Sequence, residues 1–225
     1  MTEFCPNKNY FDDIRNTTQD AINYAIQNQQ ELVEKALTQT EKIRYSKHVN
    51  GLGPLSPFFS PSLRDKDASL PLYDTPGRFR SGDYTAYHLD QSGNLLLIQY
   101  FLQHKLSAEY ILFERQGIEF AVLFSHGFGH GYDDSFSTYC MIIKDGRPQE
   151  SFVMNNLWLW GEHIDWGWHE DSGNGYLLCS SFTYPTYNPQ APGQPAYSMD
   201  RYRFVIMDDH LSDVVLEMKN KVFPA

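Results

Sequence analysis

The stretch DYTAYHLDQSGNLLLIQYFLQHKLSAEYILFERQGIEFAVLFS, residues 83–125, decides the fold class. It contains four runs that are rich in Tyr, Phe, Ile, Leu and Val, at residues 83–89, 95–103, 108–114 and 118–125. The pieces between these runs are short, and most of them contain Gly, Asn or Asp, which favour tight turns. Short β-type runs separated by short turns predict consecutive strands that pair antiparallel.

Four more runs of the same kind follow along the chain. They lie at residues 136–144, 149–155, 176–182 and 201–207. We therefore expect an α+β protein that is mainly β, with an antiparallel meander sheet or barrel-like sheet of about eight strands and a long N-terminal helix. Such a sheet either closes into a barrel or is covered on one face by that helix.

Residues 17–47 show the periodicity of an amphipathic helix, and no Gly or Pro interrupts them. The sequence Thr-Thr-Gln-Asp at 17–20 has the form of a capping box, which places the start of the helix near residue 17. The apolar side chains that would face the sheet are Ile22, Ala25, Ile26, Val33, Ala36, Leu37 and Ile43.

Residues 51–77 contain five of the 12 prolines and three glycines, and they predict an irregular connection. The expected organisation is an N-terminal helical segment at 1–50, this Pro-rich connection, and an antiparallel β domain at 78–225. The last segment, residues 210–222, fits both a helix and a strand. The number of positions that match each pattern favours a helix.

The formal net charge is −10, and it is uneven, because residues 118–225 carry 6 Lys and Arg against 14 Asp and Glu. No Lys or Arg lies between Arg147 and Arg201. A nucleic-acid-binding surface needs clustered cations, so we expect no direct contact with nucleic acid. A negative potential attracts basic proteins or metal ions instead.

No apolar run approaches the roughly 20 residues of a membrane span. The N-terminus MTEFCP lacks the basic and apolar regions of a secretory signal. The three cysteines show no metal-binding spacing, and two of them, Cys140 and Cys179, lie inside apolar runs. We therefore expect a cytoplasmic protein that makes no membrane contact and keeps these two thiols buried and free.

The most unusual segment is NNLWLWGEHIDWGWHEDSGN, residues 155–174, which holds all four tryptophans. An aromatic wall with acidic groups at its rim suits a sugar, a flat aromatic ligand or a cation. The alternative is a Trp-rich core with solvated acids. The candidate binding residues are Trp158, Trp160, Glu162, His163, Asp165, Trp166, Trp168, His169, Glu170 and Asp171.

A second candidate is the loop SHGFGHGYDD, residues 125–134. Its side chains include metal-ligand types. Two His four residues apart form a metal-binding spacing on a helix, but three glycines make a helix improbable here, although on a strand His126 and His130 would also point the same way. We therefore expect no metal and no cofactor, and one of the His could instead act as a general acid or base. The candidate residues are His126, His130, Tyr132, Asp133 and Asp134.

Two function classes follow. Because no catalytic motif with a required spacing is present, the sequence favours a non-catalytic intracellular binding protein whose acidic, Trp-rich surface receives a basic protein partner, as an immunity-type inhibitor does. The alternative is an enzyme, or a domain that binds a carbohydrate or another small ligand, through residues 155–174 and 125–134.

Overall fold

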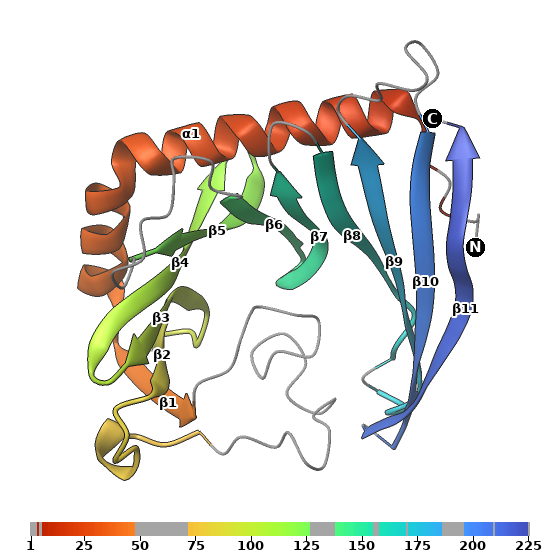
Figure 1. Cartoon of the computed structure of the whole chain (residues 1–225). Coiled ribbons are helices and arrows are strands. Elements are labelled where there is room, and N and C mark those ends of the chain that lie inside the picture. Colours follow the sequence, from red (N-terminus) through yellow and green to blue (C-terminus); the bar gives the residue numbers. More distant parts are fainter. Residues whose placement is uncertain are drawn as a thin grey trace.

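The computed structural model describes residues 4, 6–47, 72–126, 138–154, 158–169, 171–185, 196–208 and 210–224. These residues form one long helix, a short 3₁₀ helix and eleven strands (Figure 1). The elements are α1 (Lys8–Gln39), β1 (Lys42–Lys47), the 3₁₀ helix η2 (Pro76–Arg78), β2 (Tyr84–Leu89), β3 (Leu95–Leu102), β4 (Lys105–Arg115), β5 (Ile118–Ser125), β6 (Thr138–Lys144), β7 (Arg147–Met154), β8 (Trp158–Trp166), β9 (Gly175–Pro185), β10 (Ala196–Met207) and β11 (His210–Pro224).

The strands form one meander in which each strand pairs with the next, in the order β1 to β11. Every pairing is antiparallel. The sheet curves, but β1 and β11 remain separate edges, so the sheet is open and is not a closed barrel (Figure 1). The prediction of a mainly β, antiparallel protein with an N-terminal helix is confirmed.

The predicted number of strands is too low. The described residues form eleven strands, and the sequence did not predict three of them. The eight expected strands correspond to β2–β7, β9 and β10. Residues 42–47 had been assigned to the helix, but Thr40 has extended backbone angles and ends α1, and the chain then pairs with β2. Strand β8 is the Trp-rich segment itself, which pairs with β7 and β9.

The expectation of a C-terminal helix is wrong, because residues 210–224 form β11. The spacing of apolar residues in this segment fits both a helix and a strand. The segment forms a strand because the edge of β10 offers hydrogen-bonding partners for its backbone. Three register shifts in the β10–β11 pairing let the 15 residues of β11 run beside the 12 of β10. Register shifts of this kind interrupt the regular ladder of hydrogen bonds, as β-bulges do.

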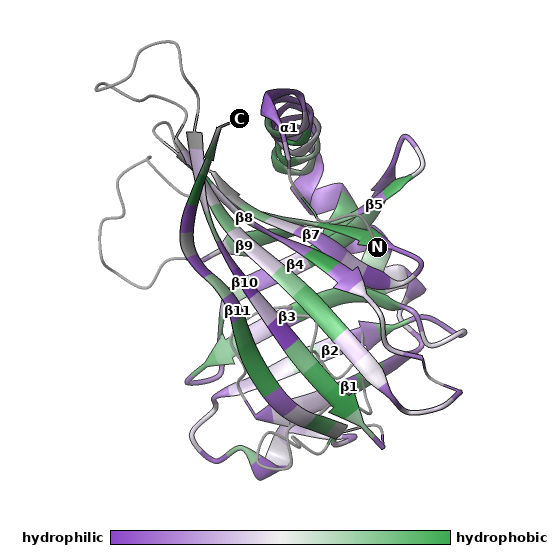
Figure 2. Ribbon diagram, turned by 90° about the vertical axis from the view of Figure 1, so that its right-hand side faces the viewer, coloured by the Kyte–Doolittle hydropathy of each residue, from purple (hydrophilic) through white to green (hydrophobic). Residues whose placement is uncertain are grey.

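Helix α1 begins earlier than the capping box predicts. Its N-cap is Asn7, whose side-chain oxygen accepts a hydrogen bond from the backbone N–H of Tyr10 at 3.1 Å. The helix lies on one side of the sheet, as Figure 2 shows by viewing it nearly end-on. Its buried residues are Phe11, Thr18, Ala21, Ile22, Ala25 and Ala36.

Three residues of the expected stripe do not lie on the buried face of α1: Ile26 is 57% exposed, Leu37 is 46% exposed, and Ile43 lies in β1. The helix is also kinked at Asn28, which has non-helical backbone angles and donates from Nδ2 to the carbonyl of Tyr24 at 2.8 Å. A kink changes the direction of the helix, so a single period of 3.6 residues does not describe the whole buried face.

Apolar side chains pack on both faces of the sheet. On the α1 side, the alanines and Ile22 of the helix pack on β3–β6 through residues such as Leu97, Ile111 and Val122. The opposite face holds a second cluster on β2–β6 that includes Tyr87 and Tyr110. The thiols of Cys140 and Cys179 are buried and free, as expected, and burial raises the pKa of both.

No helix in the described part of the chain combines the length and the apolar character that a membrane span requires.

Candidate functional site

Strand β8 divides the Trp-rich candidate residues between the two faces of the sheet, because successive side chains of a strand point in opposite directions. His163 shares the α1 face with Leu159, which packs in a cluster with Phe11 of the helix. Trp160 and Glu162 point to the other face. The ten residues therefore do not form one continuous surface.

On the α1 face, the imidazole of His163 lies between two carboxylates. Its Nδ1 is 2.6 Å from Oε1 of Glu150, and its Nε2 is 3.2 Å from Oδ1 of Asp165. Glu150 also accepts a hydrogen bond from the hydroxyl of Tyr10 at 2.8 Å. Burial alone would lower the pKa of His163, but the hydrogen bonds and charges of Glu150 and Asp165 outweigh it and raise that pKa.

On the other face, Glu162 is largely buried and does not behave as a solvated surface acid. The hydroxyl of Ser151 donates to its Oε2 at 3.3 Å. Burial raises the pKa of the Glu162 carboxyl, and the hydrogen bond from Ser151 opposes that shift. Its side chain is therefore poorly placed to attract a partner by long-range charge.

The indoles of Trp166 and Trp168 already have a cation beside them, and it belongs to this chain. The guanidinium of Arg147 lies 5.0 Å from the ring centroid of Trp166 and 5.2 Å from that of Trp168. Trp166 also donates from Nε1 to the carbonyl of Pro148 at 2.9 Å. Trp168 is 5% exposed and packs with Leu177, so it belongs to the core.

Among the remaining candidates in this segment, only His169 and Asp171 have exposed side chains that the structure describes. They lie in the turn between β8 and β9, where His169 forms a β-bridge with Asn174. Glu170 and the side chain of Trp158 lie outside the described residues.

Of the candidate residues in the second loop, the structure describes only His126; His130, Tyr132, Asp133 and Asp134 lie outside the described residues. The backbone N–H of His126 donates to the carbonyl of Ser107 at 2.7 Å. Its Nε2 is 3.1 Å from Oε1 of Glu109, a carboxylate that is only 3% exposed.

Glu109 lies at the centre of a polar network between α1 and the sheet. Gln99 donates to its Oε2 at 3.2 Å, and Gln29 of the helix donates to its Oε1 at 3.4 Å. Oε1 of Gln99 also lies 3.1 Å from Nε2 of His88. The pKa of His88 is lowered, mainly because the imidazole is buried. The one sequence signal for this network is an acidic residue inside an otherwise apolar strand.

No group of three or more His, Cys, Asp or Glu side chains suited to a metal ion occurs among the described residues. Since part of the second candidate loop lies outside them, the expected absence of a metal stays a prediction.

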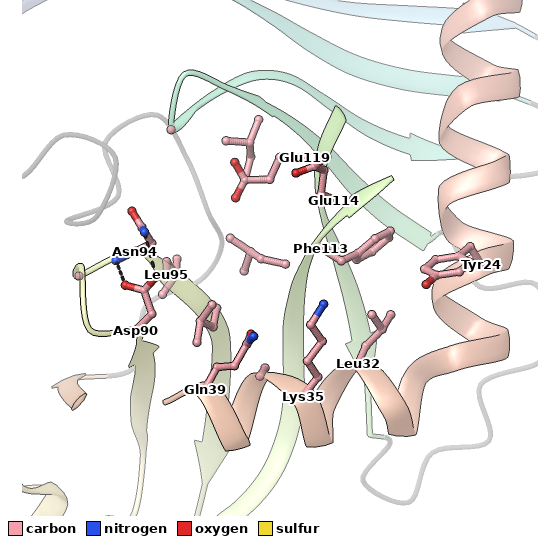
Figure 3. A pocket seen from close by; sticks show the side chains of 16 residues that line it. Tyr24, Leu32, Lys35, Gln39, Asp90, Asn94, Leu95, Phe113, Glu114 and Glu119 are labelled. Carbon is pink, nitrogen blue, oxygen red and sulfur yellow. Dashed lines mark hydrogen bonds between the residues drawn. The ribbon is translucent and has the colours of Figure 1, made fainter. Parts of the chain in front are cut away.

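A pocket of about 620 Å³ lies between the second half of α1 and one end of the sheet (Figure 3). Its walls come from the helix, the β2–β3 turn, β3, β4, β5, β6 and the β6–β7 turn. Because these segments are far apart in the sequence, no local motif marks the pocket. Its apolar part includes Tyr24, Leu32, Leu95, Leu112, Phe113 and Ile143.

Charged side chains of both signs face this pocket. Glu114 and Glu119 are directly opposite one another in the β4–β5 register, and Lys35 extends from the helix on another wall (Figure 3). Burial and the neighbouring Glu114 raise the pKa of Glu119. Within the described part of the chain, none of these three side chains forms an ion pair.

The rim of the pocket is held by a separate contact. Arg115 donates from Nε to Asp20 at 2.6 Å, and its guanidinium lies 4.5 Å from the ring centroid of Tyr24. Arg115 is therefore engaged with α1, and it ties the helix wall of the pocket to the β4–β5 turn.

Comparison with protein-family models, with curated proteins and with solved structures finds no match to this chain. The function is therefore argued from the geometry of its own residues.

Proposed function

We infer that this protein is a non-catalytic binding protein, and that its ligand is a small organic amine with an apolar body. The observation that supports this most directly is the pocket between α1 and the sheet, which joins an apolar wall to two facing carboxylates. Its volume of about 620 Å³ falls in the range of small-molecule sites.

The charges of the pocket support a cation as the polar part of the ligand. Like charges that face each other across two strands destabilise a sheet, and Glu119 is also half-buried. An ammonium group between Glu114 and Glu119 would offset this repulsion through charge-assisted hydrogen bonds. Lys35 on the helix wall repels a cation, so the amine would point toward the carboxylates and the apolar body toward Leu112 and Ile143, which share their face of the sheet.

The side chains of the pocket support binding more than catalysis. None of its described lining residues is a His, the most frequent general base, and none is a Ser, Thr or Cys that could act as a hydroxyl or thiol nucleophile. The buried His163 and His88, which have shifted pKa values, do not line it.

Titration calorimetry with 2-phenylethylammonium and with the neutral 2-phenylethanol tests this proposal. We expect the ammonium to bind at least about tenfold more tightly than the alcohol, because hydrogen bonds to charged groups contribute roughly 1.5–3 kcal/mol. The double variant Glu114→Gln with Glu119→Gln should remove this preference, whereas Asp213→Asn, which changes an exposed carboxylate on β11, should keep it. Equal binding of the two probes, or a preference that the double variant retains, would contradict the proposal.

The ligand-free protein should become more stable at neutral pH in the variant Glu119→Gln. Folding raises the pKa of Glu119, so the ionised side chain destabilises the folded state once the pH exceeds the unfolded value of about 4.3. Removing the charge should raise the melting temperature by about 1–3 °C at pH 7, because a facing like-charge pair costs roughly 0.2–1 kcal/mol. Near pH 3, where Glu119 is protonated in both states, the gain should vanish. A melting temperature that falls at pH 7 would show that the carboxylate stabilises the fold.

The hypothesis of a basic protein partner at residues 155–174 stays a prediction. Its support is the charge of the C-terminal half, but the described acidic side chains of that segment are mostly engaged within the fold. The charge-reversal variant Asp171→Lys, which changes an exposed side chain, tests it: binding to a basic partner that depends on this surface should weaken, and the effect should diminish at high ionic strength.

A further inference from the structure

Phe4, one of the described residues ahead of α1, contacts the sheet through its aromatic ring. Its ring stacks on the imidazole of His163, with ring centroids 4.0 Å apart and planes 8° from parallel. It also meets the edge of Tyr10 at 5.3 Å. Arg201 of β10 donates from Nη2 to the carbonyl of Phe4 at 3.0 Å. These contacts place Phe4 directly over His163.

The position of His163 between two carboxylates favours its doubly protonated form. A neutral imidazole carries a proton on one nitrogen only, so one of the two carboxylates would face a lone pair. The imidazolium donates to both Glu150 and Asp165. It also presents a positive charge to the ring of Phe4, and such a cation–π contact is stronger than the contact of a neutral ring.

The groups around the imidazole come from every neighbouring element. Glu150 lies on β7, Asp165 on β8 itself, and Tyr10, whose hydroxyl donates to Glu150, on α1. On the far side, β9 places the neutral Ser180 opposite His163, and Arg201 of β10 lies beside that serine at 3.3 Å. His163 is the only imidazole among these groups, and imidazole is the side chain whose charge changes near neutral pH.

We propose that His163 is a pH-sensitive latch: its protonated form holds the N-terminal segment on the sheet through Phe4, and its deprotonation at alkaline pH releases that segment.

The direction of the switch follows from the environment of His163. Its pKa is raised in the folded protein, so the latch is fully closed below the unfolded value of about 6.5 and opens as the pH rises through the raised value. Release does not require unfolding, because the helix is held separately by Phe11 and by its contacts with β2–β6.

The experiment follows the side chain of Phe4 and the ring of His163 together by NMR of the full chain, from about pH 6 to about pH 9.5. The Phe4 signals are assigned with Phe4→Leu. We expect the Phe4 signals to move toward the positions of a solvent-exposed phenylalanine with the same midpoint as the His163 ring. The variant His163→Gln should abolish this transition, and His169→Gln, which changes an exposed histidine in the next turn, should leave it intact.

A second variant keeps the test decisive if His163→Gln does not fold. Asp165→Asn preserves the size of the side chain and removes one carboxylate, so it should lower the midpoint of both signals by about one pH unit. Phe4 signals that stay constant while His163 titrates, or a Phe4 transition that survives in His163→Gln, would overturn the proposal.

Discussion

Replacing Phe11 by alanine is expected to lower the free energy of unfolding by about 3–5 kcal/mol, the range for truncation of a buried phenylalanine. Phe11 is 1% exposed and joins the first turns of α1 to β9 and β10. Its ring stacks on Tyr184 at a centroid distance of 4.3 Å and meets the edge of Phe182 at 5.3 Å. Since native domains are stable by about 5–15 kcal/mol, this loss is a large part of the total.

Thermal unfolding followed by circular dichroism measures the effect of Phe11→Ala. For a chain of this length, the melting temperature should fall on the order of 10 °C. The matched control is Ile26→Ala on the same helix, because Ile26 is 57% exposed and its truncation should change the stability by less than about 0.5 kcal/mol. Similar losses for the two variants would show that Phe11 does not dock the helix on the sheet.

The variant Gly161→Ala is expected to destabilise the protein by about 1–3 kcal/mol, the cost of inserting an extra carbon into a well-packed core. Gly161 lies on β8, directly opposite Phe152 on β7 and Phe182 on β9. A Cβ atom at this position would lie 2.7 Å from the ring of Phe152 and 2.8 Å from the ring of Phe182. Both rings are fully buried and cannot move away without displacing their neighbours.

Denaturant unfolding compares Gly161→Ala with the control Gly77→Ala, where a Cβ would meet no atom within 4 Å. The control should leave the midpoint unchanged. Combining Gly161→Ala with Phe152→Leu should recover part of the loss, because the smaller side chain makes room for the new methyl group. If Gly161→Ala alone is neutral, the two rings do not require a glycine between them.

Gly161 also explains why the Trp-rich segment was not recognised as a strand. A glycine inside a strand usually weakens it, yet here two aromatic rings from neighbouring strands cover it. That coverage depends on Phe152 and Phe182, which lie on other strands and are invisible to a local pattern. The four tryptophans and the acidic residues of this segment predicted a binding surface, whereas the tertiary structure places Trp168 in the core and His163 between two carboxylates.

The pocket could not be inferred from the sequence, because its walls are far apart along the chain. Lys35 and Glu119 are separated by more than eighty residues, and only the packing of α1 on the sheet brings them to one cavity. In contrast, the position of Glu114 opposite Glu119 follows from the sequence. Their strands are joined by a two-residue turn, and antiparallel pairing across such a turn sets which residues lie opposite each other.

The sequence by itself determined the local features of this protein: eight strands with their turns, one long helix, and the burial of two thiols in apolar runs. These follow from periodicity and turn chemistry, which act over a few residues. Only the tertiary structure decided the ends and the kink of α1, the strands β1, β8 and β11, the open edges, and the environments of His163 and Glu119. Each of these depends on which distant segment pairs or packs against a residue, because hydrogen bonding to a neighbouring strand, burial and charge are set by contacts between segments far apart in the chain.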